Sequence, residues 1–492
     1  MRFKFLLAVA VLTSATQLTY AQYVQDALRF SRSTQGTTAR MKGLGNATTA
    51  LGGDLSSVST NPAGLGFFNR SEFSFTPEYN MTSADATYWG HMETADKNQM
   101  NFNNASVVFN TKSRVGRGQD ATQGFLNFNF GLSWNRTNNF YNKLNYSGTN
   151  GDNSIADYFA ELANEPYGLE DYPEAAWGVR HQLVRLNGNL YVPNTARGAD
   201  QYFDQATTGG QNEFSVSMGT NYSNKLYLGL GLGFTSLRYR SNSTFTESND
   251  INTLDVGSNQ TVSAVPYDSF YDVTQRTNGS GFNLKLGMIY KPVSSVQLGA
   301  SFTSPTWYSI EDHTSYALQT NVADPGRSYI ESPEAYNYNY NLRTPMKVSG
   351  GMAVFFKQSG FITADVEYVD YEGMKISDTP GAENDNANIA KLYQSTVNAR
   401  LGAEGRLNPN VYLRAGYNYQ GNPEREIGSA INTYSGGIGY RGSNFYVDAT
   451  YANSSWKQQI YPYELYNSPT ASPEADVKRK YNNVYLTIGF RF

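Results

Sequence analysis

The chain has 492 residues with a formal net charge of −4, and charged residues make up only 16% of it. It has no cysteine and three histidines, which excludes disulfides, thiolate chemistry and a histidine-rich metal site, so no metal or cofactor is expected. This slightly acidic net charge gives no sign of the basic surface that nucleic-acid binding requires. A mean hydropathy of −0.52 argues against a helical membrane protein, yet 14% aromatic residues are too many for a disordered chain.

Residues 1–21 have the pattern of a secretory signal peptide. Arg2 and Lys4 precede a short apolar run, and Thr19 and Ala21 supply small residues at the −3 and −1 positions of a cleavage site. The run is much shorter than the roughly 20 residues that a membrane-spanning helix needs. No later segment reaches that length, so we expect any membrane crossing to be made by strands.

The dominant pattern after residue 70 is alternation of apolar and polar residues, which places successive side chains on opposite faces of a strand. The clearest case runs from Leu126 to Trp134, where leucine, phenylalanine and tryptophan alternate with asparagine, glycine and serine. Four later segments repeat the pattern, and the last one ends at the final residue. These segments are 226–234, 282–290, 397–404 and 484–492.

Strand length and strand ends separate a membrane barrel from a soluble sandwich, since both of them alternate. The predicted strands run to a dozen or more residues, longer than the ~5–6 of globular strands and sufficient for the ~9–11 of a tilted membrane strand. Aromatic residues such as Trp134, Tyr290 and Tyr440 lie at their ends, and the chain finishes on Phe492. We therefore predict an all-β fold, a transmembrane antiparallel β-barrel of about 14 strands over residues 71–492.

The connections between the predicted strands alternate between short and long, as in bacterial outer-membrane barrels. The three longest, at 137–211, 242–276 and 311–341, are predicted as extracellular loops. In the first of them, apolar residues from Ile155 to Ala163 and from Trp177 to Leu186 have helical spacing. Two short helices there would offer an apolar landing surface or would pack on each other as a lid, and the sequence leaves both open.

Residues 22–70 lack the alternation. Asp54 is a good N-cap for a short helix through Ser59, and Asn61 with Pro62 would end it. A fourteen-strand barrel is too wide for its wall side chains alone to fill, so we predict that this segment is a plug, or hatch, inside the lumen. A disordered extension is the alternative, but the segment is too apolar to stay solvated.

Several motifs resemble the FadL family of outer-membrane transporters for long-chain fatty acids and aromatic hydrocarbons. The resemblance covers nearly the whole mature chain. It implies a fourteen-stranded barrel plugged by its N-terminal segment, with ligands passing through a greasy lumen and a lateral opening in the wall. The motifs in the plug are 43–47, 50–57 and Asn61-Pro62-Ala63-Gly64-Leu65, and those in the barrel are 290–292, 298–306, 343–345 and 365–371.

Cations on the polar strand faces are candidate partners for a ligand carboxylate. They are Lys285, Arg400 and Arg414. The alternative is that these cations pair with acidic residues of the wall, namely Asp365, Glu367 and Glu404.

The turn Asn61-Pro62-Ala63-Gly64 is the candidate hatch gate, because asparagine can cap a turn and proline fixes φ. A turn held in this way would stay in place until a ligand displaces it.

Together these features predict an outer-membrane transporter or channel of Gram-negative type that takes up hydrophobic small molecules such as long-chain fatty acids, with the ligand and the outer-membrane lipid as its partners. The alternative is a non-transporting barrel that docks a protein-secretion complex, since a fold does not fix function. An enzyme is not expected, because His91, His181 and His313 lack a nucleophile motif beside them. No histidine pair is arranged for haem.

Overall fold

The computed structural model describes residues 21–113, 120, 122–254, 261–323, 326–467 and 471–492. The predicted signal peptide, residues 1–21, therefore lies outside the described residues except for Ala21. No helix within these ranges is both long and apolar enough to cross a membrane.

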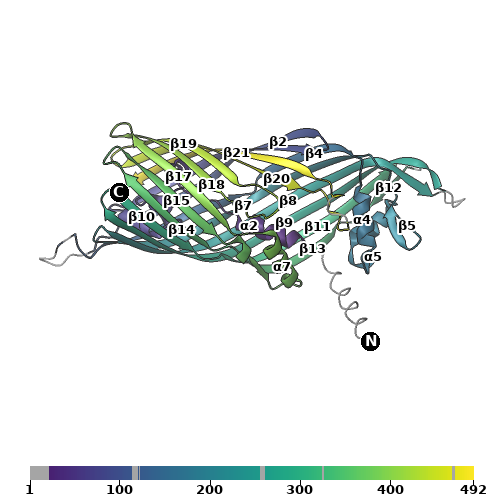
Figure 1. Ribbon diagram of the computed structural model, residues 1–492, viewed down its shortest axis with the longest axis horizontal. Coiled ribbons are helices and arrows are strands. Elements are labelled where there is room, and N and C mark those ends of the chain that lie inside the picture. Colours follow the sequence, from purple (N-terminus) through teal and green to yellow (C-terminus); the bar gives the residue numbers. More distant parts are fainter. Residues whose placement is uncertain (1–20, 114–119, 121, 255–260, 324–325, 468–470) are drawn as a thin grey trace, which may run out of the picture.

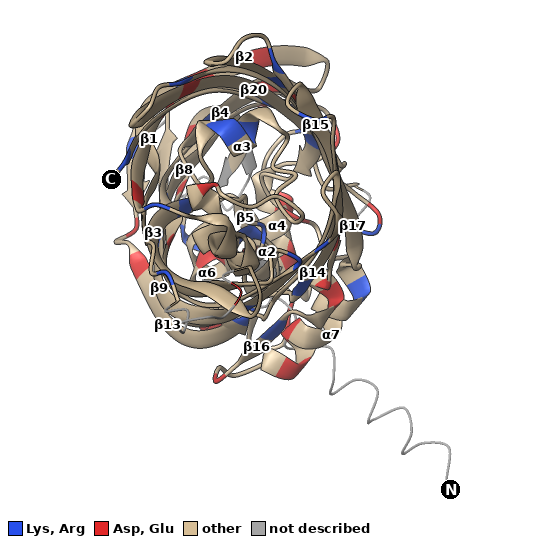
Figure 2. Ribbon diagram, turned by 90° about the vertical axis from the view of Figure 1, so that its left-hand side faces the viewer, with Lys and Arg blue, Asp and Glu red and all other residues tan. Residues whose placement is uncertain are grey.

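Most of the described chain forms one antiparallel sheet that closes on itself (Figures 1 and 2), because β21 (Ala475–Arg491) pairs with β1 (Glu72–Tyr88). Several labelled strands are pieces of one wall strand, namely β3 with β4, β10 with β11, β12 (Arg327–Ile330) and β13 with β14, and β15 with β16. Counted in this way the sheet closes as a barrel of 14 strands, which confirms the predicted fold class. The other strands of the wall are β2 (His91–Phe109), β3 (Phe125–Asn139), β4 (Asn142–Asn150), β7 (Ala199–Tyr222), β8 (Leu226–Leu254), β9 (Thr261–Val293), β10 (Val296–Thr303), β11 (Trp307–Val322), β13 (Glu334–Arg343), β14 (Lys347–Phe355), β15 (Gly360–Val369), β16 (Lys375–Ser377), β17 (Thr396–Arg406), β18 (Val411–Gln420), β19 (Ile431–Arg441) and β20 (Phe445–Ile460).

The outward faces of the strands carry an apolar belt. On β8 the side chains of Leu228, Leu230, Leu232 and Phe234 are between 39% and 55% exposed, while the glycines between them face inward. Exposure of so many large apolar side chains around a closed sheet would be unfavourable in water. The belt is the surface that a barrel presents to hydrocarbon chains.

Two of the three segments predicted as extracellular loops are largely strand, which corrects the predicted boundaries. β8 and β9 extend through most of 242–276, and β11, β12 and β13 occupy most of 311–341. The segment 137–211 holds β4 and the start of β7, with helices and a hairpin between them. Above the belt the ladder hydrogen bonds continue, but the outward-facing residues are polar, so the outward apolar row that marks a membrane strand is missing there.

A cap lies at the far end of the long strands (Figure 1). It consists of α4 (Ile155–Ala163), α5 (Gly168–Asp171), α6 (Pro173–Arg180) and the hairpin of β5 (Val184–Asn187) with β6 (Leu190–Pro193). The first predicted helix is confirmed. The second is shorter than predicted, because Gln182 has a φ of 64° and reverses the chain before β5.

The cap is fastened to the barrel at the start of α4. Ser154 Oγ donates to Glu247 Oε1 of β8 at 2.7 Å, and the Ile155 amide donates to Glu247 Oε2 at 3.0 Å. Apolar residues of the helices pack on the inner faces of β8, β9 and β11 in one cluster. The predicted helices therefore pack as a lid whose main core is shared with the barrel wall.

The N-terminal segment lies inside the barrel (Figure 2) and forms α2 (Ala21–Ser31), α3 (Ala39–Gly43), η1 (Leu55–Val58) and η2 (Pro62–Phe67). Asp54 caps η1 through the Ser56 amide at 3.0 Å, so the predicted helix is a single 3-10 turn. Asn61 caps the next turn by accepting from the Ala63 amide at 3.2 Å. Leu44, Leu55 and Leu65 are fully buried, which accounts for the apolar composition.

Glycines of the wall let the plug backbone lie directly against the strands. A Cβ at Gly287 of β9 would collide with Asn61 Oδ1, and one at Gly229 of β8 would collide with the backbone of Pro62. The same holds for Gly299 of β10 against Thr49. Since three neighbouring strands supply such seats, their glycines fix the height at which the plug sits.

Candidate functional site

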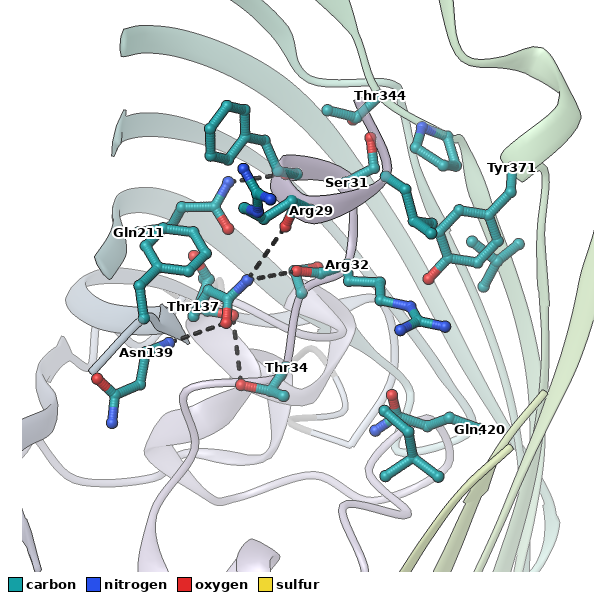
Figure 3. A pocket seen from close by; sticks show the side chains of 18 of the residues that line it. Arg29, Ser31, Arg32, Thr34, Thr137, Asn139, Gln211, Thr344, Tyr371 and Gln420 are labelled. Atoms are coloured by element: carbon teal, nitrogen blue, oxygen red, sulfur yellow. Dashed lines mark hydrogen bonds between the residues drawn. The ribbon is translucent and has the colours of Figure 1, made fainter. Parts of the chain in front are cut away.

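A cavity of about 1240 Å³ lies in the lumen above the plug. Residues of α2 and the following strap line one side of it, as Figure 3 shows, and wall strands line the rest. Its floor is formed by plug residues Thr48, Thr49, Ser59 and Thr60. The cavity is therefore closed toward the plug end of the barrel by polar backbone and hydroxyl groups.

The lining of this cavity is mixed, with charged and amide side chains beside aromatic and aliphatic ones, whereas the family resemblance implied a greasy lumen. Nine cationic side chains line it, against six carboxylates. The carboxylates are Glu78, Glu213, Glu367, Glu424, Glu426 and Glu464. The cations are Arg29, Arg32, Lys42, Arg136, Lys285, Lys347, Lys391, Arg400 and Arg479. The excess of cations favours ligands that carry an anionic group.

Lys285, the first predicted ligand partner, lines the cavity at its floor. Its Nζ pairs with Glu213 and donates to the Ser59 carbonyl of the plug at 2.8 Å. Glu213 also accepts from Asn283 Nδ2 at 2.9 Å. The ammonium therefore joins the wall to the plug, and the Lys285 side chain also lines the cavity.

Arg400 also lines the cavity, and one of its terminal nitrogens donates to Glu367 Oε1 at 2.5 Å. Its Nε and second terminal nitrogen are buried without a partner among the described residues. Asp365 instead accepts from the Thr49 amide of the plug at 2.8 Å. Arg400 thus has hydrogen-bond donors left over for a ligand.

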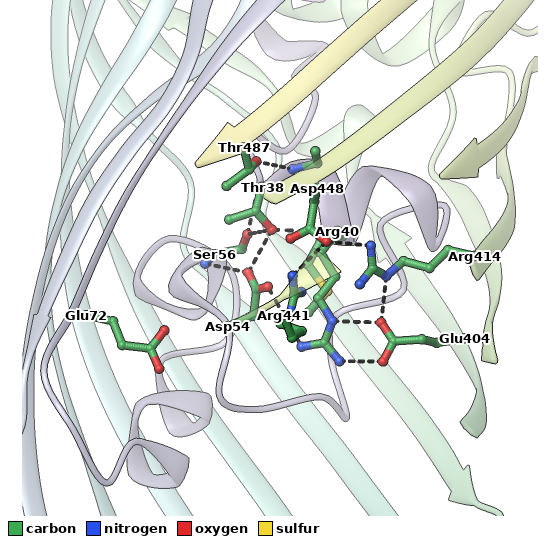
Figure 4. A network of polar contacts seen from close by, with 12 residues as sticks. Thr38, Arg40, Asp54, Ser56, Glu72, Glu404, Arg414, Arg441, Asp448 and Thr487 are labelled. Atoms are coloured by element: carbon green, nitrogen blue, oxygen red, sulfur yellow. Dashed lines mark hydrogen bonds and ion pairs between the residues drawn. The ribbon is translucent and has the colours of Figure 1, made fainter. Parts of the chain in front are cut away.

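Arg414 is placed differently from the other two, in a network beneath the cavity (Figure 4). Its Nε donates to Glu404 Oε2 at 2.6 Å and a terminal nitrogen donates to Asp448 Oδ1 at 2.7 Å. Arg40 of the plug shares Glu404 with it. Arg414 does not line the cavity, so its pairing joins plug and wall.

Five further cations line the cavity without an acidic group within 4.0 Å in the part of the chain that the structure describes. They are Lys42, Arg136, Lys347, Lys391 and Arg479. Lys347 Nζ donates to Ser33 Oγ at 2.6 Å, and Lys42 Nζ donates to the Gln35 carbonyl at 2.7 Å. Burial lowers the pKa of Lys42 to about 8. These cations were not among the predicted partners.

Helix α2 fills a place where three neighbouring wall strands are interrupted. The breaks fall at 304–306, 344–346 and 370–374, between the pieces of each strand. Tyr23, Val24 and Leu28 of α2 pack there in one buried cluster with α7 (Ala382–Leu392) and the wall. The plug helix is thus part of the wall as well as of the lumen.

Among the described strands, the wall lacks backbone pairing between β2 and β4, which lie side by side. β2 pairs with β3 only from Asn104 to Phe109, and its outer part, residues 91–103, has no backbone pairing with β4. At the outer end the two strands are joined by a side-chain bond from Asn145 Nδ2 to Glu93 Oε2 at 2.5 Å. The unpaired stretch between these limits is a candidate lateral window.

The strap between α2 and α3 lies directly behind this window. Asn103 Nδ2 donates to the Thr37 carbonyl at 2.5 Å, and Asn138 Nδ2 donates to the Arg32 carbonyl at 2.8 Å. The Thr34 amide donates to the Thr137 carbonyl at 2.7 Å (Figure 3). The cavity lining includes these window residues, so the plug strap separates the cavity from the outside at this point.

A row of tyrosines connects the region under the cap with the plug helix. Tyr271, Tyr316, Tyr336, Tyr338 and Tyr23 follow one another with ring centroids 5.6–6.3 Å apart. Tyr271 also contacts α4 of the cap. The row is a series of aromatic contacts from the cap to α2. Tyr271 and Tyr23 at its ends are buried, Tyr316, Tyr336 and Tyr338 are half-buried, and the lining of the cavity includes none of the five.

A closed barrel with an apolar belt, a plug made from its own N-terminal segment and a cavity above that plug has the architecture of plugged outer-membrane channels. The fold is similar to that of a Pseudomonas aeruginosa FadL homologue, with a TM-score of 0.54 and 13% identity over 93% of this chain and 98% of that one. It is also similar to the P. putida toluene transporter TodX, with a TM-score of 0.53 and 13% identity over 93% and 99%. No protein-family model and no curated protein matches the chain. The chain therefore has the FadL-type barrel fold that its motifs predict.

Proposed function

We propose that this protein is an outer-membrane channel of Gram-negative type for the uptake of small hydrophobic molecules that carry an anionic group, such as long-chain fatty acids. The observation that carries the proposal is the lumen cavity above the plug with its excess of cations, set inside a barrel that presents an apolar belt. A carboxylate would be held by charge-assisted hydrogen bonds, and the apolar part would contact aromatic and aliphatic lining residues. The fold likeness to transporters and channels supports the same reading and gives no reason to expect an enzyme.

The proposed path has three stages. A molecule first meets the tyrosine row beneath the cap, where rings supply apolar contact. It then enters the cavity, where Lys347 and Arg400 offer donors to its anionic group. It leaves through the window between β2 and β4 when the strap behind the window moves. In that sequence α2 and its strap respond to the ligand, because they contact both the cavity and the window.

The hatch turn Asn61-Pro62-Ala63-Gly64 remains the proposed gate for any passage past the plug. Asn61 holds it through two donations from Nδ2, to the Thr49 carbonyl at 2.6 Å and to the Ala300 carbonyl of the wall at 3.3 Å. Breaking the bond to Ala300 would release Asn61 from β10, and breaking the bond to Thr49 would release it from the neighbouring plug backbone. In this proposal the two bonds hold the gate shut. A ligand on the floor of the cavity can influence them, because Thr49 is part of that floor.

A reversible crosslink tests the channel and the gate separately. A Cβ at Gly131 of β3 would lie 2.6 Å from Val58 Cγ2 of η1, so cysteines at these two positions are within disulfide reach. The chain has no native cysteine, which leaves Val58→Cys with Gly131→Cys as the sole pair and Gly131→Cys alone as the control.

Uptake of a labelled long-chain carboxylate into cells or liposomes is then measured in oxidised and reduced forms. We expect the oxidised pair to lose uptake and the reduced pair to recover it. Equal uptake in both forms would disprove hatch gating and leave the channel intact. Absence of uptake and of ligand binding in the unmodified protein would disprove the channel itself.

A further inference from the structure

A row of basic side chains crosses the outer face of the barrel on three neighbouring strands. Arg240 of β8 lies directly opposite Arg276 of β9, and Arg276 lies directly opposite His313 of β11. Arg238 stands two residues below Arg240 on the same face, and the three arginines are exposed. This row is separate from the lumen cavity and plays no part in the proposed path.

The pairing of Arg240 with Arg276 is unfavourable in the isolated protein. Side chains directly opposite on antiparallel strands have Cβ atoms roughly 5 Å apart, and like charges in that position repel. Neither guanidinium has a carboxylate within 4.0 Å among the described residues. Glu311 is the acidic residue on the same face in the row below, across from Asn278. The repulsion would be relieved by an anion bound between the two arginines.

The height of the row places that anion at the membrane surface. Phe234, Phe282 and Trp307 are in register and form the outermost apolar row on these strands. Arg238 is four residues and Arg240 six residues farther along β8. With a rise of about 3.3 Å per residue and a tilt of about 40°, the guanidiniums stand roughly 10–15 Å above the belt. That is the zone of lipid headgroups and their sugars.

We propose that Arg238, Arg240 and Arg276 bind the phosphate of a phosphorylated glycolipid of the outer leaflet, whose acyl chains lie along the Leu and Phe columns directly below. Guanidinium groups bind phosphate through two parallel hydrogen bonds, and two opposed arginines can hold one phosphate from both sides. The columns of Leu232 and Phe234 on β8 and of Leu284 on β9 supply the apolar contact for the acyl chains. The lipid fits the site as a whole, because its phosphate would meet the arginines while its acyl chains meet the apolar columns below them.

The opposite part of the wall provides a matched control. Lys457 of β20 and Lys478 of β21 are also directly opposed and exposed, at six residues beyond the exposed Tyr451. Here Asp85 of β1 lies directly opposite Lys478 on its other side and pairs with Lys480 at 2.7 Å. This lysine pair has an acidic neighbour in register, so it does not need a bound anion to the same degree.

The test compares Arg240→Gln/Arg276→Gln with Lys457→Gln/Lys478→Gln, which removes the same number of charges. Each protein is purified in detergent and incubated with a bisphosphorylated acylated disaccharide, with its dephosphorylated form, or with inorganic phosphate. Native mass spectrometry counts the bound lipid, and thermal unfolding reports stabilisation. We expect the unmodified protein and the lysine variant to retain the phosphorylated lipid and the arginine variant to retain at least tenfold less.

Other outcomes would overturn the proposal. Equal retention by the two double variants would mean that the arginine row is not the site. Equal binding of the dephosphorylated lipid would remove the phosphate from the interaction, and full stabilisation by millimolar inorganic phosphate would show an ion site without lipid. Arg276→Lys keeps the charge and loses the two-pronged geometry, so intermediate retention is expected even if the double variant folds poorly. The proposal rests on the barrel standing in a membrane and is independent of what passes through the lumen.

Discussion

Arg40 of the plug and Glu404 of the wall form a two-pronged ion pair, with Nε to Oε2 at 2.9 Å and a terminal nitrogen to Oε1 at 3.0 Å. Glu404 also accepts from Arg414, which pairs with Asp448 as well, so the two cations share one carboxylate and each has a second one nearby. The pair lies below the cavity floor (Figure 4), where it ties the plug to β17. Plug and wall are therefore joined by charge as well as by packing.

Replacing Glu404 with glutamine should loosen the plug. Two guanidiniums would lose the carboxylate that they share, although Arg414 keeps Asp448 and Arg40 keeps Asp54, and breaking a buried pair costs about 3–5 kcal/mol. We expect faster amide hydrogen exchange in residues 38–58 and raised ion conductance in planar bilayers. Glu72→Gln, which breaks a partly exposed pair with Arg491 at the barrel end, is the control and should leave both readouts unchanged. Unaltered exchange in Glu404→Gln would mean that packing alone holds the plug.

The glycine seat at Gly287 should tolerate no side chain. Gly287→Ala would push a methyl group into Asn61 and into the Ala63 amide, so we expect the turn at 61–64 to be displaced, at a cost of roughly 1–3 kcal/mol. Hydrogen exchange of residues 58–67 measures the displacement. Gly350→Ala on β14 is the matched control, because a Cβ there meets nothing within 4 Å. Identical exchange in the two variants would show that the plug does not depend on this seat.

Lys347 should contribute to binding of anionic ligands and not of neutral ones. Its ammonium lines the cavity and bonds only to the neutral Ser33 hydroxyl among the described residues. Loss of one charge-assisted hydrogen bond is worth about 1.5–3 kcal/mol, so we expect Lys347→Met to weaken a long-chain carboxylate by roughly 10- to 100-fold. Affinity for the corresponding neutral alcohol should stay the same. A parallel loss for both ligands would point to a collapsed cavity, and Lys457→Gln on the outer face should change neither.

The cap should lose stability as the pH falls. Burial lowers the pKa of His181 to about 4, from an ordinary value of 6.5, and the ring faces Glu331, Arg180 and the Thr320 hydroxyl. Between pH 6.5 and 4 the unfolded cap binds a proton that the folded cap does not, so stability decreases as the pH drops through that range, by at most about 3 kcal/mol. Above pH 7 this histidine has no effect on stability.

Exchange of amides in the cap helices, followed between pH 7.5 and 4.5, checks this expectation. His181→Gln should flatten the pH dependence, while the same change at the exposed His91 should leave it in place. A pH dependence that persists in His181→Gln would assign the effect to another group, such as Glu331.

The barrel could be predicted because lipid imposes a strict rule on the sequence. A wall that faces hydrocarbon needs an apolar residue at every second position, and that alternation is visible without a structure. Beyond the belt the rule ends. Arg276, within the predicted loop 242–276, is still on a strand, but nothing in its neighbours marks one, so the outer parts of β8 and β9 were predicted as a loop.

The cavity was only partly predictable. Lys285 and Arg400 lie at the alternate positions that face the lumen on strands with a clear apolar alternation. Lys347 is on the same face as Ser349, so it could have been found in the same way. Arg479 precedes the predicted start of its strand by one residue. A β-bulge follows Arg136, so the alternation does not show on which face of the strand its side chain lies.

Lys42 depends on how the plug folds. Contacts between residues far apart in the chain decide its position, and a local pattern cannot express them.

The attachment of the cap to Glu247 sets how far the molecule reaches from the cell. Glu247 is thirteen residues beyond Phe234 on β8, which corresponds to roughly 30 Å above the apolar belt. If the protein takes up sparingly soluble compounds as proposed, they would first contact it at this height. The long β8–β9 hairpin holds the cap there, away from the membrane surface.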